Sequence, residues 1–289
     1  MGAERAVIRA AVLLGVAVAV VVGRAQEPLF RSRIEGVRVD VLVTENGRPV
    51  TGLTAADFVL RDAGVDQAVA LIGQQDLPLG VVLTIDLSAS LKPPALAALR
   101  RAGHALVDAL RADDTAALLT FNHRVTEQVA PTRELSRVRA ALDAAPPGGD
   151  TSLADAALAA LLRGDASGGR TLVVLFSDGV DTASFQTAEV VLETARRVNG
   201  VVYGVWAGDG DPRFLRDLTR ATGGRLIDIG EGGDPGPAFL EALAEFRSRY
   251  LLTYEPAGVP AGGWHPLEVR VLRRGARVEA RTGYFATTP

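Results

Sequence analysis

Three short segments of this 289-residue chain carry oxygen-bearing side chains that could hold a hard metal ion. The first is Asp86-Leu87-Ser88-Ala89-Ser90, which follows an apolar run over residues 79–85. The second is Gly148-Gly149-Asp150-Thr151-Ser152-Leu153, and the third is Leu175-Phe176-Ser177-Asp178-Gly179. Each segment offers carboxylate or hydroxyl groups close to an apolar stretch, so a folded chain could bring them together.

Carboxylates and hydroxyls offer only hard oxygen atoms, which suit Mg²⁺, Mn²⁺ or Ca²⁺ better than softer metals. Two carboxylates and three neutral hydroxyls would roughly neutralise a dication. Mg²⁺ prefers about six ligands and keeps several waters. Such a set therefore leaves one coordination position for an oxygen atom from outside, most simply a carboxylate. This chemistry describes a binding device rather than a catalyst.

The three segments lie within an alternating pattern of strands and helices. Apolar runs predict strands over residues 79–85, 115–121, 171–176, 201–207 and 225–229, with amphipathic helices between them. This alternation is typical of an α/β fold with a doubly wound, mostly parallel sheet. Ligands of such sheets bind beyond the carboxyl ends of the strands. We therefore expect Asp86, Thr151 and Asp178 to converge at one edge of the sheet, in loops outside the core.

Both flanks of this pattern show the alternation of β-strands. Val37, Val39, Val41 and Val43 alternate with other residues at one end, as do Tyr250, Leu252 and Tyr254 at the other. The flanks, residues 30–75 and 248–289, are each too small to hold a core alone. The sequence therefore predicts that they form one small antiparallel β-sandwich, with an α/β domain over residues 78–236 inserted between them.

The N-terminus has the pattern of a secretory signal. Arg5 and Arg9 precede an apolar run over residues 10–22, and Gly23-Arg24-Ala25 follows. This predicts a signal peptide over residues 1–25, cleaved near Ala25, and an exported, periplasmic or extracellular protein. The alternative is an uncleaved anchor, but the run is shorter than the roughly 20 residues of a membrane helix. We expect no membrane span in the mature chain.

Composition narrows the classes of function further. The chain contains no cysteine, which excludes disulfides and cysteine metal sites, so its cores must be stable without them. The formal net charge is −3, and without residues 1–25 there are 28 basic and 33 acidic residues, a net charge of −5. Because no clustered basic face emerges, we do not expect nucleic-acid binding.

The oxygen-bearing set resembles a known metal site. Asp86, Ser88, Ser90, Thr151 and Asp178 are similar in type and order to the metal-ion-dependent adhesion site of von Willebrand factor A (VWA) domains. The resemblance implies a Rossmann-like VWA domain in which these five side chains surround one Mg²⁺, with Mn²⁺ or Ca²⁺ as alternatives. It also implies a protein partner that offers a carboxylate to the metal.

The flanks resemble a narrower group, the bacterial exported "VWFA-related" proteins of the acidobacterial type. The resemblance rests on residues 39–44, 49–58, 250–254 and 281–285, and it covers nearly the whole chain after residue 25. Two positions depart from the group's pattern: Leu91 stands where Met is usual, and Asp150 adds an acidic residue before Thr151. The resemblance implies a cation-dependent, adhesion-type binding module of the bacterial cell envelope.

Two other functions are compatible with the sequence. The first is a metal-dependent hydrolase on the same fold, which would need a base such as Asp150 or His123 near a metal-activated water. The chain has no Gly-x-Ser-x-Gly elbow and no evident Ser–His–Asp set, so we predict no enzymatic activity. The second is a structural metal, with the β-rich flanks as the working surface.

Overall fold

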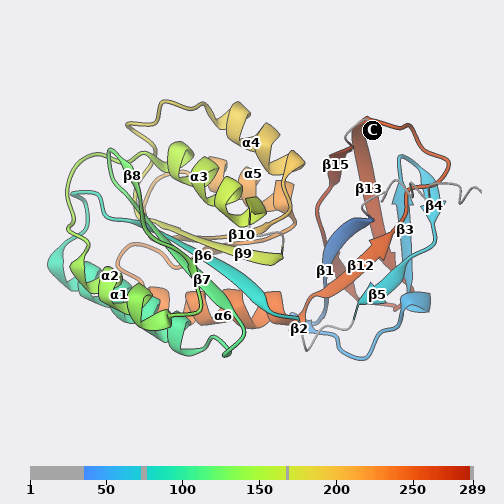
Figure 1. The fold of residues 1–289 in the computed structure, drawn as a ribbon, viewed down its shortest axis with the longest axis horizontal. Coiled ribbons are helices and arrows are strands. Elements are labelled where there is room, and N and C mark those ends of the chain that lie inside the picture. The colour runs from blue at the N-terminus through green and yellow to red at the C-terminus, as the bar shows by residue number, and fades with distance from the viewer. Residues whose placement is uncertain (1–35, 73–76, 167–168, 287–289) are drawn as a thin grey trace, which may run out of the picture. The chain divides into compact units, whose positions relative to one another are not determined.

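The computed structural model describes residues 36–72, 77–166 and 169–286, which all lie in one compact unit. Its centre is a mostly parallel sheet with strand order β11-β10-β9-β6-β7-β8 (Figure 1). The parallel strands are β6 (Leu79–Asp86), β7 (Thr115–Phe121), β9 (Arg170–Ser177), β10 (Val201–Trp206) and β11 (Leu226–Asp228), and β8 (Val125–Thr132) is the antiparallel edge. The predicted α/β fold with a doubly wound sheet is confirmed.

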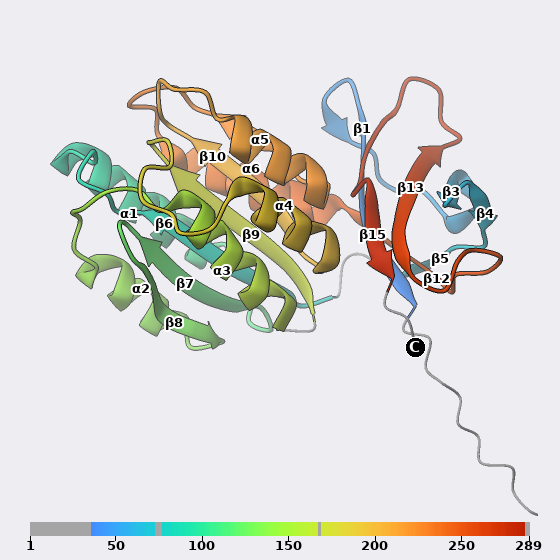
Figure 2. The same ribbon diagram turned by 90° about the horizontal axis from the view of Figure 1, so that it is seen from above.

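Helices cover both faces of this sheet (Figures 1 and 2). They are α1 (Pro93–Asp108), α2 (Leu135–Ala144), α3 (Leu153–Ala166), α4 (Ala188–Arg197), α5 (Arg213–Thr222) and α6 (Pro235–Ser248). The first, second and sixth share one apolar core, and the third to fifth share the other. Within β6, Val81 and Leu83 belong to the first core and Val82 to the second. Burial on both faces explains why these strands are continuously apolar.

Two elements of the α/β part were not predicted, β8 and α2. Most side chains of β8 are exposed, and only Val129 is fully buried. Helix α2 buries only Val138 and Leu142. Both elements lie at the margin of the core, where few apolar residues are needed. Their sequences therefore lack the long apolar pattern that marks the inner strands.

The two flanks pair with each other. The N-terminal flank supplies β1 (Val37–Glu45), β2 (Arg48–Pro49), a 3-10 turn (Ala55–Asp57), β3 (Phe58–Asp62), β4 (Val65–Gln67) and β5 (Ala70–Ile72). The C-terminal flank supplies β12 (Tyr250–Tyr254), β13 (Gly263–Val271), β14 (Arg277–Glu279) and β15 (Gly283–Ala286). The described strands form two sheets, one containing β14-β1-β12-β5 and the other β15-β13-β3-β4, and they share an apolar core. The predicted sandwich is thus present, while the exact domain boundaries stay predictions.

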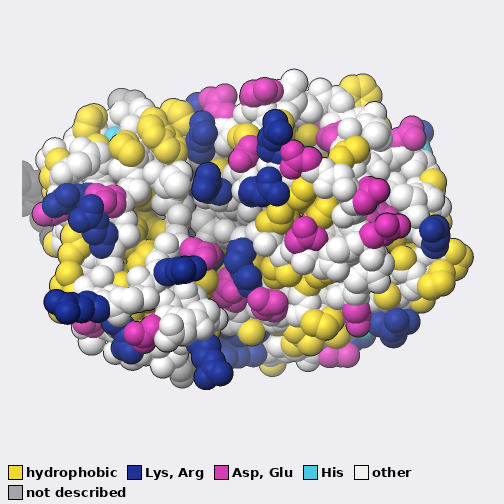
Figure 3. Space-filling model, turned by 180° about the vertical axis from the view of Figure 1, so that it is seen from behind, with side chains coloured by type: hydrophobic (Ala, Val, Ile, Leu, Met, Phe, Trp, Pro, Cys, Tyr) yellow, Lys and Arg dark blue, Asp and Glu magenta, His cyan; other side chains and the backbone are white. Residues whose placement is uncertain are grey.

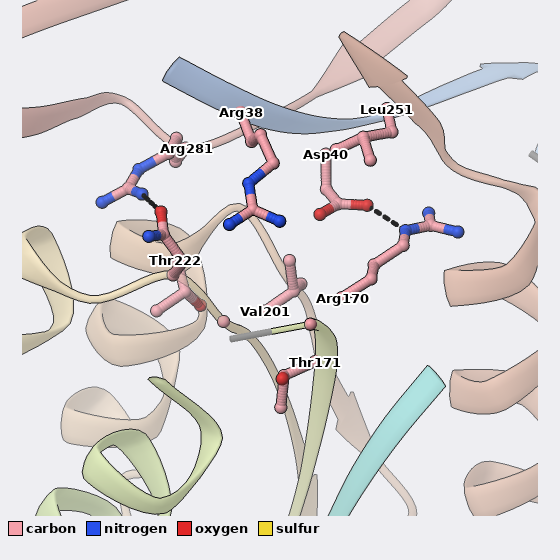
Figure 4. A pocket seen from close by; sticks show the side chains of 11 residues that line it. Arg38, Asp40, Arg170, Thr171, Val201, Thr222, Leu251 and Arg281 are labelled. Carbon is pink, nitrogen blue, oxygen red and sulfur yellow. Dashed lines mark hydrogen bonds and ion pairs between the residues drawn. The ribbon is translucent and has the colours of Figure 1, made fainter. Parts of the chain in front are cut away.

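An arginine at the start of β9 links the sandwich to the α/β part. Arg170 Nε donates to Asp40 Oδ1 at 2.6 Å, and its Nη2 donates to the carbonyl oxygens of Phe246 and Arg249 at 2.9 and 3.0 Å. Figure 4 shows Asp40 and Arg170 beside Arg38 and Arg281, around a small cavity. The start of β9, strand β1 and the end of α6 are therefore held together by charge-assisted hydrogen bonds.

The predicted signal peptide, residues 1–25, lies outside the described residues, so its cleavage near Ala25 stays a prediction. Within the described ranges, no helix is both long enough and apolar enough to cross a membrane. Acidic and basic side chains are interspersed over the face that Figure 3 shows. That distribution agrees with the absence of a clustered basic stretch in the sequence.

The strand pairing predicts that the sandwich is a single folding unit. Deleting residues 248–289 removes the β12 and β14 neighbours of β1 and the β13 neighbour of β3. Isolated hairpins are marginal in water, so residues 37–72 should become sensitive to protease. Limited proteolysis with mass spectrometry checks this, with a chain ending at Ala286 as the control. Persistent protection of residues 37–72 in the truncated chain would contradict it.

Candidate metal centre

Asp86 ends strand β6 at the carboxyl edge of the sheet. Strands β6 and β9 are parallel and paired, with Ile85 opposite Phe176, so the residues that follow them emerge side by side. The Asp86 side chain is fully buried. Its Oδ2 accepts a hydrogen bond from Ser177 Oγ at 2.6 Å, and its Oδ1 accepts one from the Ser88 amide at 2.9 Å. These contacts fix the orientation of the carboxylate.

A short chain of hydroxyl groups joins the first and third segments. Ser88 Oγ lies 2.8 Å from Ser90 Oγ, and Ser90 Oγ donates to Asp178 Oδ1 at 2.9 Å. Ser88 is buried, Asp178 is half-buried and Ser90 is exposed. The set therefore runs from the interior to the surface, where a ligand from outside could reach it.

The second segment is held against the other two by backbone hydrogen bonds. The Gly148 amide donates to the Leu87 carbonyl at 2.7 Å, and the Ala89 amide donates to the Gly149 carbonyl at 2.9 Å. Thr151 is buried, and its Oγ1 lies 3.5 Å from the position that a Cβ atom on Gly179 would take. The structure thus brings together the three segments that carry the five predicted site residues.

The electrostatics of the site favour a cation. The pKa of Asp86 is raised to about 6, mainly by burial and to a smaller extent by the neighbouring Asp178. Burial also raises the pKa of Asp178. Among the described residues, no basic side chain forms a salt bridge with either carboxylate. Two partly desolvated carboxylates without a positive partner are costly, and a dication bound by hard oxygen atoms would offset that cost.

The five predicted ligands include two carboxylates and no histidine or cysteine. Across the described ranges, no three His, Cys, Asp or Glu side chains gather as a metal site. The oxygen set contains only two carboxylates, and its remaining members are hydroxyls. Such a set suits hard, oxygen-preferring cations, and it lacks the imidazole and thiolate ligands that softer metals prefer.

The burial of Asp86 corrects one expectation. We expected its side chain in a loop outside the core, but it lies beneath the loops, at the end of a strand that is buried on both faces. Its carboxylate is enclosed by its own strand, by Ser177 at the end of β9 and by the Ser88 amide. Replacement by Ala would therefore leave a hole and remove the acceptor of the Ser88 amide, so Asn is the better test of the carboxylate's charge.

Three supporting residues were not predicted from the sequence. Ser177 orients Asp86, as described above. Asp181 Oδ2 accepts a hydrogen bond from the Ala154 amide at 2.7 Å, in the first turn of α3. Asp155 accepts hydrogen bonds from the amides of Phe185 and Gln186 at 3.0 and 2.9 Å. The only signal for Ser177 was its position between a buried strand and Asp178.

The two side chains that a hydrolase could use as a base are both exposed. His123 lies in the bend after β7, packed against Gly149, and Asp150 lies in the loop before α3. No hydrogen bond from either to Asp86 or Asp178 is present among the described residues. The other two histidines have structural partners: His104 Nε2 lies 2.9 Å from Asp143 Oδ1, and His265 Nδ1 lies 2.7 Å from Asp62 Oδ1.

The Ser177 hydroxyl predicts a measurable effect on metal affinity. Ser177→Ala removes the 2.6 Å hydrogen bond to Asp86 Oδ2. Groups that orient a metal ligand typically contribute about 10- to 100-fold to affinity, so we expect about tenfold weaker Mg²⁺ or Mn²⁺ binding by calorimetry. Ser248→Ala, which removes a hydroxyl bonded to the Glu245 carbonyl, should have no effect. Equal affinities in the two variants would contradict the orienting role.

Comparisons with known proteins agree with this architecture. The family model of the von Willebrand factor type A domain matches residues 81–180. No curated protein matches the chain. A solved von Willebrand factor type A structure from Catenulispora acidiphila is 14% identical, with a TM-score of 0.51, and the match covers 89% of this chain and 76% of that one.

Two further solved structures are similar over about three fifths of this chain. Proximal thread matrix protein 1 from the mussel byssus, with zinc in its metal-ion-dependent adhesion site motif, is 16% identical with a TM-score of 0.53. That match covers 64% of this chain and 49% of that one, so this chain spans about half of the mussel protein. An aerotolerance-related membrane protein from Bacteroides fragilis is 15% identical with a TM-score of 0.49, covering 58% of this chain and 98% of that one.

At such identities the solved structures show the fold alone. The family match supplies the domain's identity, and it spans the stretch from β6 to the loop after β9, which contains all five predicted ligands. The strand order and the two helical layers around the sheet agree with it. The chain therefore contains a von Willebrand factor type A domain.

Proposed function

We propose that this protein is a cation-dependent protein-binding module of the bacterial cell envelope. In this proposal Asp86, Ser88, Ser90, Thr151 and Asp178 hold one divalent cation, Mg²⁺ or alternatively Mn²⁺ or Ca²⁺, and a partner protein completes the site with a carboxylate. The observation that carries the proposal is the pair of desolvated carboxylates, joined by serine hydroxyls, that has no basic partner among the described residues.

Each protein group has a distinct part in this arrangement. Asp86 and Asp178 supply negative charge, and the hydroxyls of Ser88, Ser90 and Thr151 supply neutral oxygen. A bound dication would present a positive charge at the surface, to which a carboxylate from outside is attracted. Ser90 is exposed and Asp178 is half-buried, so the open side of the site faces solvent rather than the core.

The features that predict export also support a role in the cell envelope. The pattern of residues 1–25 predicts a signal peptide, and the flanks resemble exported bacterial proteins with a VWA domain. The mussel protein, whose adhesion-site motif holds zinc, is a matrix protein with a similar fold. A binding role outside the cytoplasm is consistent with these likenesses, although none of them identifies the partner.

Binding to envelope proteins tests the proposal. Immobilised protein should retain a partner from a cell-envelope extract in Mg²⁺ and release it in EDTA. Asp178→Asn should abolish that retention. Asp113→Asn is the matched control, because Asp113 is exposed and lies just before β7, at the opposite edge of the sheet. Replacing one partner carboxylate by its amide should also abolish binding. Retention that survives EDTA undiminished would reject the proposal.

A further inference from the structure

Phe185 is the most exposed large hydrophobic residue among those described, with 92% of its surface accessible. It lies in the loop between β9 and α4, which also carries Asp178. An aromatic side chain in water forgoes the free energy that burial would give it. A partner that covered the ring would recover that free energy.

The loop that presents Phe185 is held in place by its neighbours. Asp155 accepts hydrogen bonds from the amides of Phe185 and Gln186 at 3.0 and 2.9 Å. Asp181 accepts one from the Ser184 amide at 3.0 Å, and the Ser184 hydroxyl accepts one from the Asp155 amide at 3.1 Å. Because the backbone is fixed on both sides of the ring, covering it would cost little loop entropy.

Phe185 is also close to the proposed metal centre. The amides of Thr182 and Ala183 donate to the Thr151 carbonyl at 2.9 and 3.0 Å. Phe185 lies three residues after Thr182, which places their Cα atoms no more than about 11 Å apart. Val180, which is half exposed, lies in the same loop between Asp178 and Thr182. Two exposed apolar side chains, Val180 and Phe185, thus lie in the loop that carries Asp178 and contacts Thr151.

The rim of this face is acidic. Asp150 precedes Thr151 and is exposed. Asp209 is exposed in a loop packed on the metal-site loop: a Cβ on Gly208 would lie 2.6 Å from the Asp178 carbonyl, and one on Gly210 would lie 3.0 Å from Val180 Cγ1. Neither aspartate forms a salt bridge in the described part of the chain. A densely acidic partner would be repelled here, whereas a basic group would be attracted.

We propose that Phe185 is the apolar anchor of the docking face around the metal centre, and that the partner is a protein segment with one carboxylate flanked by apolar and basic residues. The carboxylate would meet the metal, the apolar residue would cover Phe185 and Val180, and the basic residue would face Asp150 and Asp209. This inference rests on the proposed metal-dependent capture of a carboxylate, and it adds the chemistry of the segment around that carboxylate.

Peptide selection tests the inference without a known partner. A displayed library of random dodecapeptides is selected on the full chain in Mg²⁺, with elution by EDTA, and the enriched peptides are synthesised for calorimetry. We expect an acidic residue with apolar and basic neighbours. Phe185→Ala should weaken their binding by about tenfold or more, as for an aromatic hot spot. Leu272→Ala is the matched control, because Leu272 is 70% exposed and lies in the sandwich, outside the domain that carries the metal site.

The outcomes separate the two proposals. Metal-dependent acidic peptides that bind Phe185→Ala and the unchanged chain equally well would overturn the anchor and leave the proposed function standing. Enriched peptides with only acidic neighbours would overturn the role of the acidic rim. Peptides whose binding survives EDTA, or a selection that yields no metal-dependent peptide, would contradict the proposed function itself. Because Phe185 is exposed, its replacement by Ala leaves the core unchanged.

Discussion

Replacement of Asp62 by Ala is expected to lower the free energy of unfolding of the β-sandwich by about 3–5 kcal/mol. Asp62 ends β3 and is fully buried. Its Oδ2 accepts hydrogen bonds from the hydroxyls of Tyr254 and Tyr284 at 2.9 and 2.8 Å, and its Oδ1 lies 2.7 Å from His265 Nδ1. The substitution leaves the Tyr254 hydroxyl without its acceptor, and it leaves Tyr284 and His265 only their mutual contact, at 3.3 Å between Tyr284 Oη and His265 Nδ1.

The buried cluster of Asp62, Tyr254, His265 and Tyr284 also joins the two flanks. We therefore expect a large loss of stability. Asp62 belongs to the N-terminal flank, and its three partners lie on β12, β13 and β15 of the C-terminal flank. Burial, together with the hydrogen bond to Asp62, raises the pKa of Tyr284 to about 12. Its hydroxyl therefore stays protonated and donates throughout the physiological range.

Urea unfolding would measure the loss in free energy of unfolding, and hydrogen exchange at the β1 and β3 amides would show that the loss lies in the β-sandwich. Asp66→Ala is the matched control, because Asp66 is exposed on β4 and its ion-pair partner in the described part of the chain is the exposed Arg61. Exposed pairs of this kind contribute about 0–1 kcal/mol. If the two substitutions had equal effects, the buried cluster would not be what joins the flanks.

The parallel core was predictable because its signals are local. Runs such as 79–85 and 171–176 are apolar except for Thr84 and Thr171, and this pattern is typical of strands buried on both faces. The end of α5 before Gly223-Gly224 has a local signal as well. Gly223 caps α5 in the left-handed conformation, with φ at +77°, a conformation that glycine adopts without strain.

The supporting contacts were not predictable, because their partners are far apart in the sequence. Asp62 is separated by 192 residues from Tyr254 and by 203 from His265. No local pattern distinguishes it from an aspartate in a solvated turn. The same holds for Asp155 and Asp181, since only the fold shows that they hold the backbone of neighbouring segments. The five site residues were predicted from the resemblance, and their role as metal ligands stays a prediction.

Asp86→Asn is expected to abolish stabilisation by divalent ions. A ligand that binds only the folded state at 100 times its Kd stabilises it by about 2.7 kcal/mol. The unchanged chain should gain about that much in saturating Mg²⁺, and the variant should gain none. Asn keeps the carbonyl that accepts from the Ser88 amide, and its amide nitrogen can donate to Ser177 Oγ, so the fold should persist. Thermal unfolding with and without EDTA measures both gains, with Asp113→Asn as the control.

The pH dependence of stability, measured without metal for the unchanged chain and for Asp86→Asn, shows whether the variant differs by its missing charge or by a disturbed fold. The pKa of Asp86 is raised in the folded state from 3.8 to about 6 by burial, so the folded protein holds this proton more tightly than the unfolded chain. Stability is therefore greatest below the unfolded pKa and falls as the pH rises through about 6, by about 3 kcal/mol. The raised pKa of Asp178 acts in the same direction.

In EDTA, Asp86→Asn should lack most of this fall in stability and should be more stable than the unchanged chain at pH 8. A variant less stable than the unchanged chain at that pH would show that the Asp86 carboxylate stabilises the fold without a cation, which the desolvation argument rejects.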